Sequence, residues 1–337
     1  MTSNDFWFPR LLVYDRIPVM SAKLSHHLTS SLLVCGLICS LVTGCDDLLN
    51  VEADPPKSEM ASESESKPKR RSGRPTYRLV AEDGASGLPR GATTLDERLV
   101  EMDRLFLKVM SGDEVTGGGK VSITYKDSRK VDVISANIQR IQLDQAVVAY
   151  NMAMTGQDPI ETVEPSPLQG QVLTADRGEV SMPGVPTVEQ KKALAEYQGL
   201  WLGGNDLFPN YEVKSGDSWQ VKPKLLLEAI FDSEFQKVSG KVDLIVKRRM
   251  NLDGHECAEI SISLERCKGV TTSTDGSETE LEMHGYGTLY RAIDIFHVLK
   301  ADLSGDVVLT MDRSDGLTMR NSGGFEFTAT SSVSRSE

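Results

Sequence analysis

The sequence predicts an α+β fold in which one large, curved antiparallel sheet of about ten strands, a half-barrel or open barrel, packs on two helices. Alternating apolar and polar residues, Asp-Gly turns at regular intervals and two helix-capping sequences support this prediction. With 39% hydrophobic and 26% charged residues, the composition is that of a folded soluble domain and excludes a disordered protein. The net charge of −12 excludes a whole-protein basic surface for nucleic acid.

Two segments carry the start of a helix. Thr94 and Glu97 form a capping box, and the apolar residues that follow recur at spacings of 4, 3, 4 and 3 up to Ser111. Thr187 and Gln190 form a second capping box, which predicts a helix to about Trp201. Both helices are expected to pack an apolar side on the sheet.

The C-terminal half predicts strands with one buried and one wet face, because apolar and polar residues alternate with a period of two. The apolar members are Val242, Leu244 and Val246; Ala258, Ile260, Ile262 and Leu264; Leu281 and Met283; and Phe325 and Phe327. Turns are expected at Asp253-Gly254, Asp275-Gly276, Ser304-Gly305 and Asp315-Gly316. A three-residue loop over 252–254, with Gly254 left-handed, sets Val246 opposite Ile260 and keeps one face apolar.

The N-terminal half of the folded part has a less regular pattern. Strands are expected at 77–80, 121–125, 131–143, 146–155, 168–175 and 219–221. Turns are expected around Asp144 and at 176–178, and Gly117-Gly118-Gly119-Lys120 is expected to form a glycine-rich hairpin loop. We expect residues 76–337 to form one domain, with two subdomains divided near residue 205 as an alternative.

The N-terminus carries a targeting segment. Residues 28–42 form an uncharged, mostly apolar run that is too short for a transmembrane helix and fits a signal-peptide core. Translation from Met20 would give a signal peptide of ordinary length, ending at residue 44. The sequence therefore predicts a protein that is exported from the cytoplasm.

Four residues at the end of this segment resemble the lipobox of bacterial lipoproteins: Val42, Thr43, Gly44 and Cys45. The resemblance implies recognition of the first three by the signal peptidase, cleavage before Cys45 and attachment of acyl chains to its sulfur. Two or three acyl chains give stable membrane anchoring. An ordinary secretory signal that contains a cysteine is the alternative. Cys35 and Cys39 lie within the apolar run and would be removed with it.

Residues 45–75 are expected to form the lipid anchor and a disordered tether, because they are rich in Ser, Glu, Pro and Lys and lack a hydrophobic period. The tether contains a basic cluster: Lys67, Lys69, Arg70, Arg71 and Arg74. This cluster could contact an anionic envelope surface, or it could be a solvated charge run that keeps the tether extended. We expect a location in the bacterial cell envelope. The sequence does not predict which of its membranes holds the anchor.

Three short turn motifs mark the folded part: Ser166-Pro167-Leu168-Gln169-Gly170, Leu207-Phe208-Pro209 and Gly216-Asp217-Ser218-Trp219. With the Asp253-Gly254 hairpin, they resemble a family of bacterial cell-envelope lipoproteins with a C-terminal domain of unknown function, over about residues 138–330. The resemblance implies an envelope location and brings no activity. The combination of anchor, tether and curved sheet is also similar in architecture to periplasmic lipoprotein carriers with half-barrel folds.

The sequence predicts no catalytic residues, no metal site and no cofactor. His255 and Glu256 begin a zincin-like sequence, but Glu259 replaces the second histidine and the segment enters a strand. His297 beside Asp294 is expected to form a surface pair. Cys257 and Cys267 lie ten residues apart on one expected strand, too far for a disulfide, so two free thiols are expected unless the strand breaks.

These observations favour a non-enzymatic, lipid-anchored envelope protein whose curved sheet binds an apolar or peptidic ligand. The alternative is an envelope assembly or protein-interaction module that uses a sheet edge or an outer patch. A hydrolase is the third hypothesis, and it would need a cleft with convergent titratable groups that the sequence does not reveal.

Overall fold

The computed structural model describes residues 75–81, 87–135, 137–176, 179–197, 204–231, 235–272, 278–313 and 316–335. Its twelve strands are β1 (Ala92–Ser111), β2 (Glu114–Ser135), β3 (Ile138–Met154), β4 (Ile160–Pro165), β5 (Val172–Asp176), β6 (Glu179–Ser181), β7 (Ser218–Val221), β8 (Gln236–Leu252), β9 (His255–Thr272), β10 (Glu278–Ala292), β11 (His297–Asp312) and β12 (Leu317–Arg335). The helical segments are α2 (Val188–Glu196), the 3₁₀ turn η1 (Asn205–Leu207) and α3 (Pro223–Phe231). The signal segment, the lipobox and the tether lie outside the described residues.

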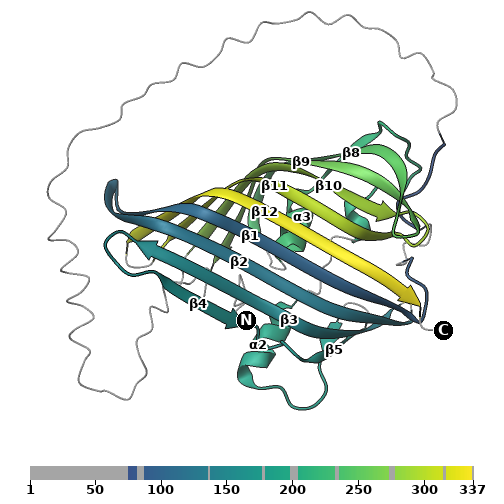
Figure 1. The fold of residues 1–337 in the computed structure, drawn as a ribbon, viewed down its shortest axis with the longest axis horizontal. Coiled ribbons are helices and arrows are strands. Elements are labelled where there is room, and N and C mark those ends of the chain that lie inside the picture. Colours follow the sequence, from purple (N-terminus) through teal and green to yellow (C-terminus); the bar gives the residue numbers. More distant parts are fainter. Residues whose placement is uncertain are drawn as a thin grey trace, which may run out of the picture. The chain divides into compact units, whose positions relative to one another are not determined.

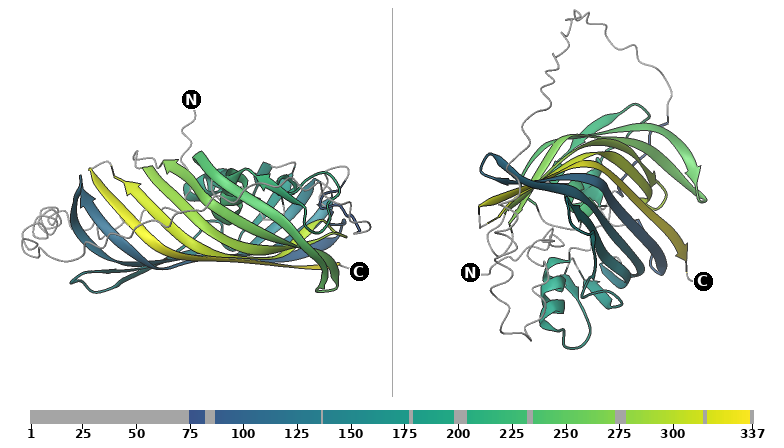
Figure 2. Two further views of the ribbon diagram at one scale, coloured as in Figure 1. Left: turned by 90° about the horizontal axis from the view of Figure 1, so that it is seen from above. Right: turned by 60° about the vertical axis from the view of Figure 1, so that its left-hand side comes forward.

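All twelve strands belong to one antiparallel sheet with the order β6-β5-β3-β2-β1-β12-β11-β10-β9-β8-β7, and β4 pairs with β3. The long strands run side by side, and the sheet that they form is strongly curved, with α3 on its concave side (Figures 1 and 2). The N-terminal strand β1 pairs with the C-terminal strand β12, so the two ends of the folded part meet in the middle of the sheet (Figure 1).

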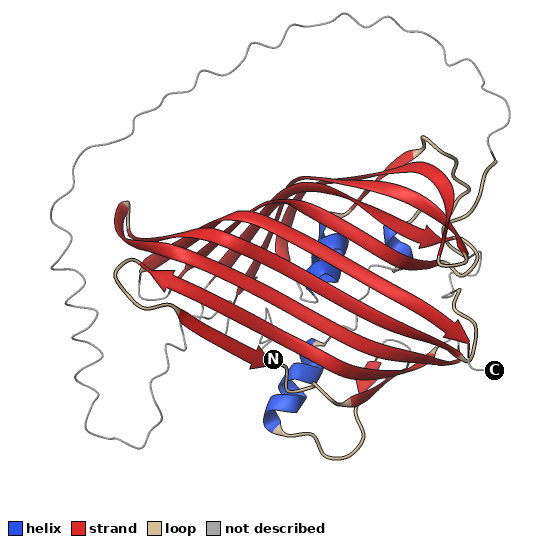
Figure 3. Ribbon diagram, viewed as in Figure 1, coloured by secondary structure: helices blue, strands red, loops and turns tan. Residues whose placement is uncertain are grey.

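The fold class expected from the sequence is wrong in its helical part. The fold is nearly all β, with two short α-helices set against a sheet of 12 strands, rather than an α+β fold in which the sheet packs on two helices (Figure 3). The curved, open antiparallel sheet agrees with the expectation. The described helices α2 and α3 are too short to cross a bilayer.

The helix expected from Thr94 is the strand β1. Its buried face carries Val100 and Met102, and after a β-bulge it continues at Leu105 and Leu107. The bulge inserts one extra residue between the buried residues Met102 and Leu105, so they are three positions apart instead of two. A spacing of three is also typical of one face of a helix. Two residues of the expected helix face, Leu95 and Phe106, are instead 52% and 60% exposed.

The second capping box forms as expected. The Thr187 hydroxyl accepts from the Gln190 amide, the Gln190 side chain accepts from the Thr187 amide, and α2 follows. The helix ends at Glu196, before the expected end. Helix α3 is not predicted from the sequence, because its apolar run of Leu225, Leu226 and Leu227 cannot be distinguished from a buried strand by periodicity.

The β8–β9 hairpin has the predicted register but a different turn. Val246 pairs with Ile260, and Leu244 with Ile262, as expected. The turn is the two-residue loop Asp253-Gly254, in which both residues have positive φ, 51° and 85°. Asp-Gly favours this type I′ geometry. A bulge after Val246 removes the one-residue slip that this turn would cause, so the apolar residues stay on one face.

Several other expected turns differ. Ser304 and Gly305 lie within β11, and the three glycines 117–119 lie within β2, paired with β1. Strands β2 and β3 are joined between Ser135 and Ile138 rather than at Asp144. Strands β5 and β6, which flank the expected turn at 176–178, do pair; residues 177 and 178 lie outside the described part of the chain. The expected turn at Asp275-Gly276 and the residue Asp315 lie outside the described residues.

The buried residues of the described chain form three apolar clusters. The largest lies between α3 and the long strands, and it includes Leu226, Leu227 and Ile260. A second cluster joins β2, β3 and β5 to α2 through Leu143, Leu173 and other residues. A third, smaller cluster surrounds Cys257. The candidate site lies where the first two clusters meet.

Candidate functional site

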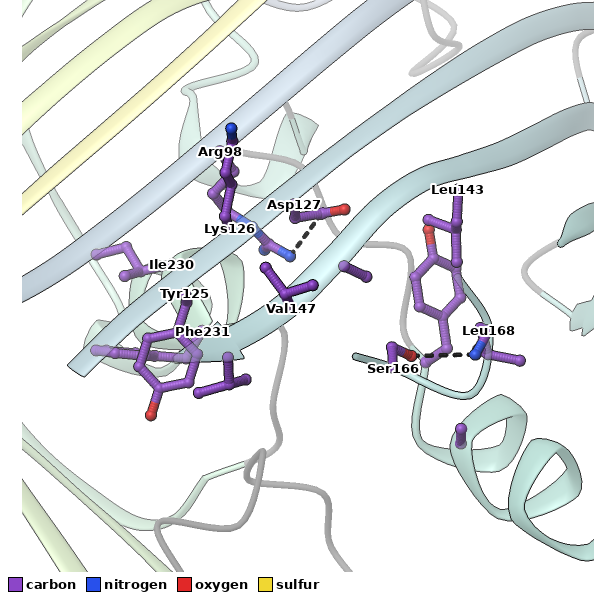
Figure 4. Close-up of a pocket in the computed structure, with 14 residues that line it drawn as sticks. Arg98, Tyr125, Lys126, Asp127, Leu143, Val147, Ser166, Leu168, Ile230 and Phe231 are labelled. Carbon is purple, nitrogen blue, oxygen red and sulfur yellow. Dashed lines mark hydrogen bonds and ion pairs between the residues drawn. The ribbon is translucent and has the colours of Figure 1, made fainter. Parts of the chain in front are cut away.

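A cavity of about 90 Å³ opens on the buried face of the sheet. Its walls come from β1, β2 and β3, the loop after β4, the residues around the end of α2 and the C-terminal end of α3 (Figure 4). Apolar side chains dominate the lining: Leu143, Val148, Leu168, Ala193, Ile230 and Phe231. The lining is therefore mainly apolar, with charged side chains from Arg98, Lys126 and Asp127.

Strand pairing places the polar lining residues side by side. Arg98 on β1 lies opposite Asp127 on β2, which lies opposite Ala146 on β3. One step along the same face, Val100, Tyr125 and Val148 form the next row. Because alternate residues of a strand share a face, Tyr125 and Asp127 both point to the cavity side. Figure 4 shows the ring of Tyr125 directed away from the Arg98–Asp127 pair.

Arg98 connects the sheet to α3. Its guanidinium donates to Asp127 Oδ2 at 2.9 Å and to the carbonyl oxygen of Ala229 at 3.0 Å. Ala229 lies in the last turn of α3, where carbonyl oxygens lack helical partners and a cation is favoured. The ion pair is well buried, with side-chain exposures of 10% for Arg98 and 14% for Asp127.

Two polar atoms at the cavity have no hydrogen-bond partner within the described part of the chain: Asp127 Oδ1 and the Tyr125 hydroxyl. Both atoms are shielded from solvent. Burial raises the pKa of Tyr125 well above its ordinary value, so the phenol is neutral. A buried polar atom without a partner costs about 1–3 kcal/mol, and native structures contain few of them. Two residues of the lining, Tyr125 and Asp127, therefore each carry a buried polar atom that no described residue satisfies.

A second charged row borders the cavity. Arg129 Nε donates to Asp96 Oδ2 at 3.3 Å, and Arg129 also donates to the Tyr197 hydroxyl at 3.1 Å. Asp96 accepts from the Ser331 hydroxyl at 2.6 Å. With Arg98 and Asp127, these two residues form what we call the polar belt: Asp96, Arg98, Asp127 and Arg129. The belt separates the two larger apolar clusters, and its four charges balance.

His297 closes this network, contrary to the expected surface pair with Asp294. Its Nε2 lies 2.8 Å from Ser331 Oγ, and burial lowers its pKa to about 4, although Asp96 opposes the shift. Asp294 instead contacts His255, at 2.8 Å. Ser331 stands between the carboxylate and the imidazole, an order that differs from a catalytic triad, in which the histidine bridges the other two.

The residues singled out in the sequence have different outcomes. The lipobox (Val42, Thr43, Gly44, Cys45) and the basic cluster (Lys67, Lys69, Arg70, Arg71, Arg74) precede the described residues. Cys257 and Cys267 are buried free thiols on β9, as expected. Of the motif Gly216-Asp217-Ser218-Trp219, Gly216 lies in a turn and Ser218 and Trp219 begin β7, where Trp219 donates to the carbonyl of Leu207. Within the described residues, no group of three or more His, Cys, Asp and Glu could hold a metal ion.

Sequence reasoning missed the polar belt and Tyr125. One pattern could have identified the belt: an acid is followed two residues later by a base on β1 (Asp96, Arg98), and the same order recurs on β2 (Asp127, Arg129). Such pairs share a strand face and become complementary only when the two strands run antiparallel. The helical spacing around Asp96 and Arg98 hides this match, because two residues of a helix that are two positions apart do not share a face.

Comparisons with known proteins give no family. No family model matches the chain, and no curated protein matches its sequence. Among solved structures, lipovitellin, from work on lipid–protein interactions in lipovitellin, aligns with 74% of this chain and 26% of its own, at 7% identity and a TM-score of 0.38. The chain thus spans about a quarter of lipovitellin. The binding domain of botulinum neurotoxin serotype C1 aligns over 70% of this chain and 78% of its own, at 7% identity and a TM-score of 0.12. These TM-scores carry no argument about fold or function.

Proposed function

We propose that this protein is a non-enzymatic binding protein that holds an apolar ligand against the buried face of its sheet. The observation that carries the proposal is the cavity of about 90 Å³ beside Arg98, Asp127 and Tyr125, which is mainly apolar and carries two unsatisfied polar atoms. Ligand sites typically combine an apolar lining with a few placed polar groups.

The size of the cavity limits the ligand. The volume corresponds to roughly six to nine water molecules. This space suits a single apolar chain or a small ring system rather than a folded peptide. Of the apolar and peptidic ligands expected from the sequence, the cavity favours the apolar kind.

The proposed setting is the bacterial cell envelope, with the folded part anchored through acyl chains on Cys45. The lipobox-like residues and the tether composition support this setting. The basic cluster of the tether would then lie near the membrane surface, where anionic head groups attract it. Mass spectrometry of the mature N-terminal peptide tests the anchor; a mature N-terminus that does not begin at an acylated Cys45 would contradict it.

The binding function is tested by filling the cavity. Ala146 lines it, so Ala146→Leu should lower the affinity for the fluorescent apolar probe N-phenyl-1-naphthylamine at least tenfold. Ala149 lies on the same strand and its side chain points to the opposite face, so Ala149→Leu is the matched control and should bind like the wild type. Equal affinities for the two variants, or no binding by the wild-type protein, would refute the proposal.

A further inference from the structure

The polar end of the ligand has to match the charges beside the cavity. Arg98 is already paired with Asp127 and bonded to the Ala229 carbonyl. Asp127 uses one carboxylate oxygen for Arg98, and the other, Oδ1, is buried and has no hydrogen-bond partner in the described part of the chain. The hydrogen-bonding position left open on this pair is therefore an acceptor.

From this arrangement we propose that the ligand carries an uncharged hydrogen-bond donor, such as the hydroxyl of a long-chain alcohol or an amide, which donates to Asp127 Oδ1. This inference rests on the proposed binding function and names the ligand class of the same cavity. The hydroxyl of Tyr125, directed away from the ion pair, offers a second position for a polar atom farther along the ligand (Figure 4).

Charge balance favours a neutral donor over an ion. The two acids and two bases of the polar belt already compensate one another. A carboxylate placed against Asp127 Oδ1 would meet a like charge in a poorly solvated site. An ammonium group would bring a buried positive charge without a counter-ion of its own, which is costly. A hydroxyl or amide satisfies the open acceptor and leaves the balance unchanged.

Lys126 supplies the competing interpretation. It also lines the cavity, but its side chain is exposed, and it belongs to the alternate set of β2 residues that faces away from Tyr125 and Asp127. An anionic ligand could reach out of the cavity to this ammonium group. The two interpretations predict opposite orders of affinity for ligands that differ only in the polar end.

The test compares three probes of equal chain length, 1-octanol, octanoate and octylamine, by isothermal titration calorimetry with the wild-type protein at neutral pH. The alcohol is expected to bind at least tenfold more tightly than either ion. Octanoate or octylamine binding as tightly as the alcohol would overturn the inference and leave the proposed function intact. Failure of all three probes to bind would overturn both.

Two variants locate the effect. Asp127→Asn removes the charge that excludes an anion, so the preference for 1-octanol over octanoate should fall at least tenfold. Asp132→Asn is the matched control, because Asp132 lies on the same strand and faces the other way, and it should keep the wild-type preference. If Lys126→Gln, rather than Asp127→Asn, changes the preference, the anion interpretation is correct and the inference is wrong.

Discussion

The two halves of the buried face are filled in different ways. Beneath α3, strands β8 and β9 present mainly apolar side chains, such as Val246, Ile260 and Leu264, to a mostly apolar helix that carries one buried carboxylate, Glu228. Across β1 and β2, the same face carries the four charges of the polar belt and a cavity. The comparison shows that hydrophobic burial dominates the first half. The second half needs residues far apart in sequence to match in register and in charge.

The largest expected effect comes from breaking the belt. Arg129→Met would leave Asp96 buried without its cation, and such changes cost about 3–5 kcal/mol. The free energy of unfolding, measured by urea denaturation, should fall by about that amount. In the double variant Asp96→Asn/Arg129→Met no charge is left unpaired, so most of the loss should be recovered.

A surface pair provides the contrast for this experiment. Lys268 contacts Glu280 and Glu282 at 3.3 and 3.0 Å, but all three side chains are partly exposed. Lys268→Met should leave the urea midpoint nearly unchanged, because solvent screens such pairs. If Arg129→Met unfolds at the wild-type urea midpoint, as Lys268→Met is expected to do, the polar belt does not stabilise the fold.

A smaller effect should appear as pH dependence at His297. Its folded-state pKa of about 4 lies below the ordinary value of about 6.5, because burial disfavours the charged imidazole. Between these values the unfolded chain binds more protons than the folded chain, so stability is lost as pH falls from about 6.5 to about 4. The shift corresponds to roughly 3 kcal/mol.

The variant His297→Gln isolates this contribution. It keeps a hydrogen-bonding side chain near Ser331 but cannot titrate, so its stability should fall less than that of the wild type over this pH range. Urea midpoints measured for both proteins from pH 7 to pH 4 give the comparison. Parallel curves would mean that His297 is not buried in solution.

The same contrast explains how much the sequence could predict. In the apolar half, alternation predicted the pairing of Val246 with Ile260, although the predicted turn was wrong and a bulge after Val246 corrected the register. In the polar half, alternation was hidden, because Asp96 and Arg98 occupy buried positions of β1 and a bulge shifts the pattern before Leu105. A buried charge is recognised only with its partner, and the partner of Arg98 lies 29 residues away.

The smallest expected effect concerns the cavity itself. Tyr125→Phe removes a buried hydroxyl that has no partner in the described structure, while its ring keeps the edge-to-face contact with Phe231. In the ligand-free protein this change should leave stability unchanged or raise it by about 1 kcal/mol, since an unsatisfied polar atom is lost. Urea denaturation measures the difference, with the exposed Tyr286→Phe as the matched control. A clear loss of stability would mean that the hydroxyl bonds within the protein and is not held open for a ligand. A gain in stability would indicate that the Tyr125 hydroxyl is kept for binding at a cost in stability. No such cost is expected for the apolar residues beneath α3.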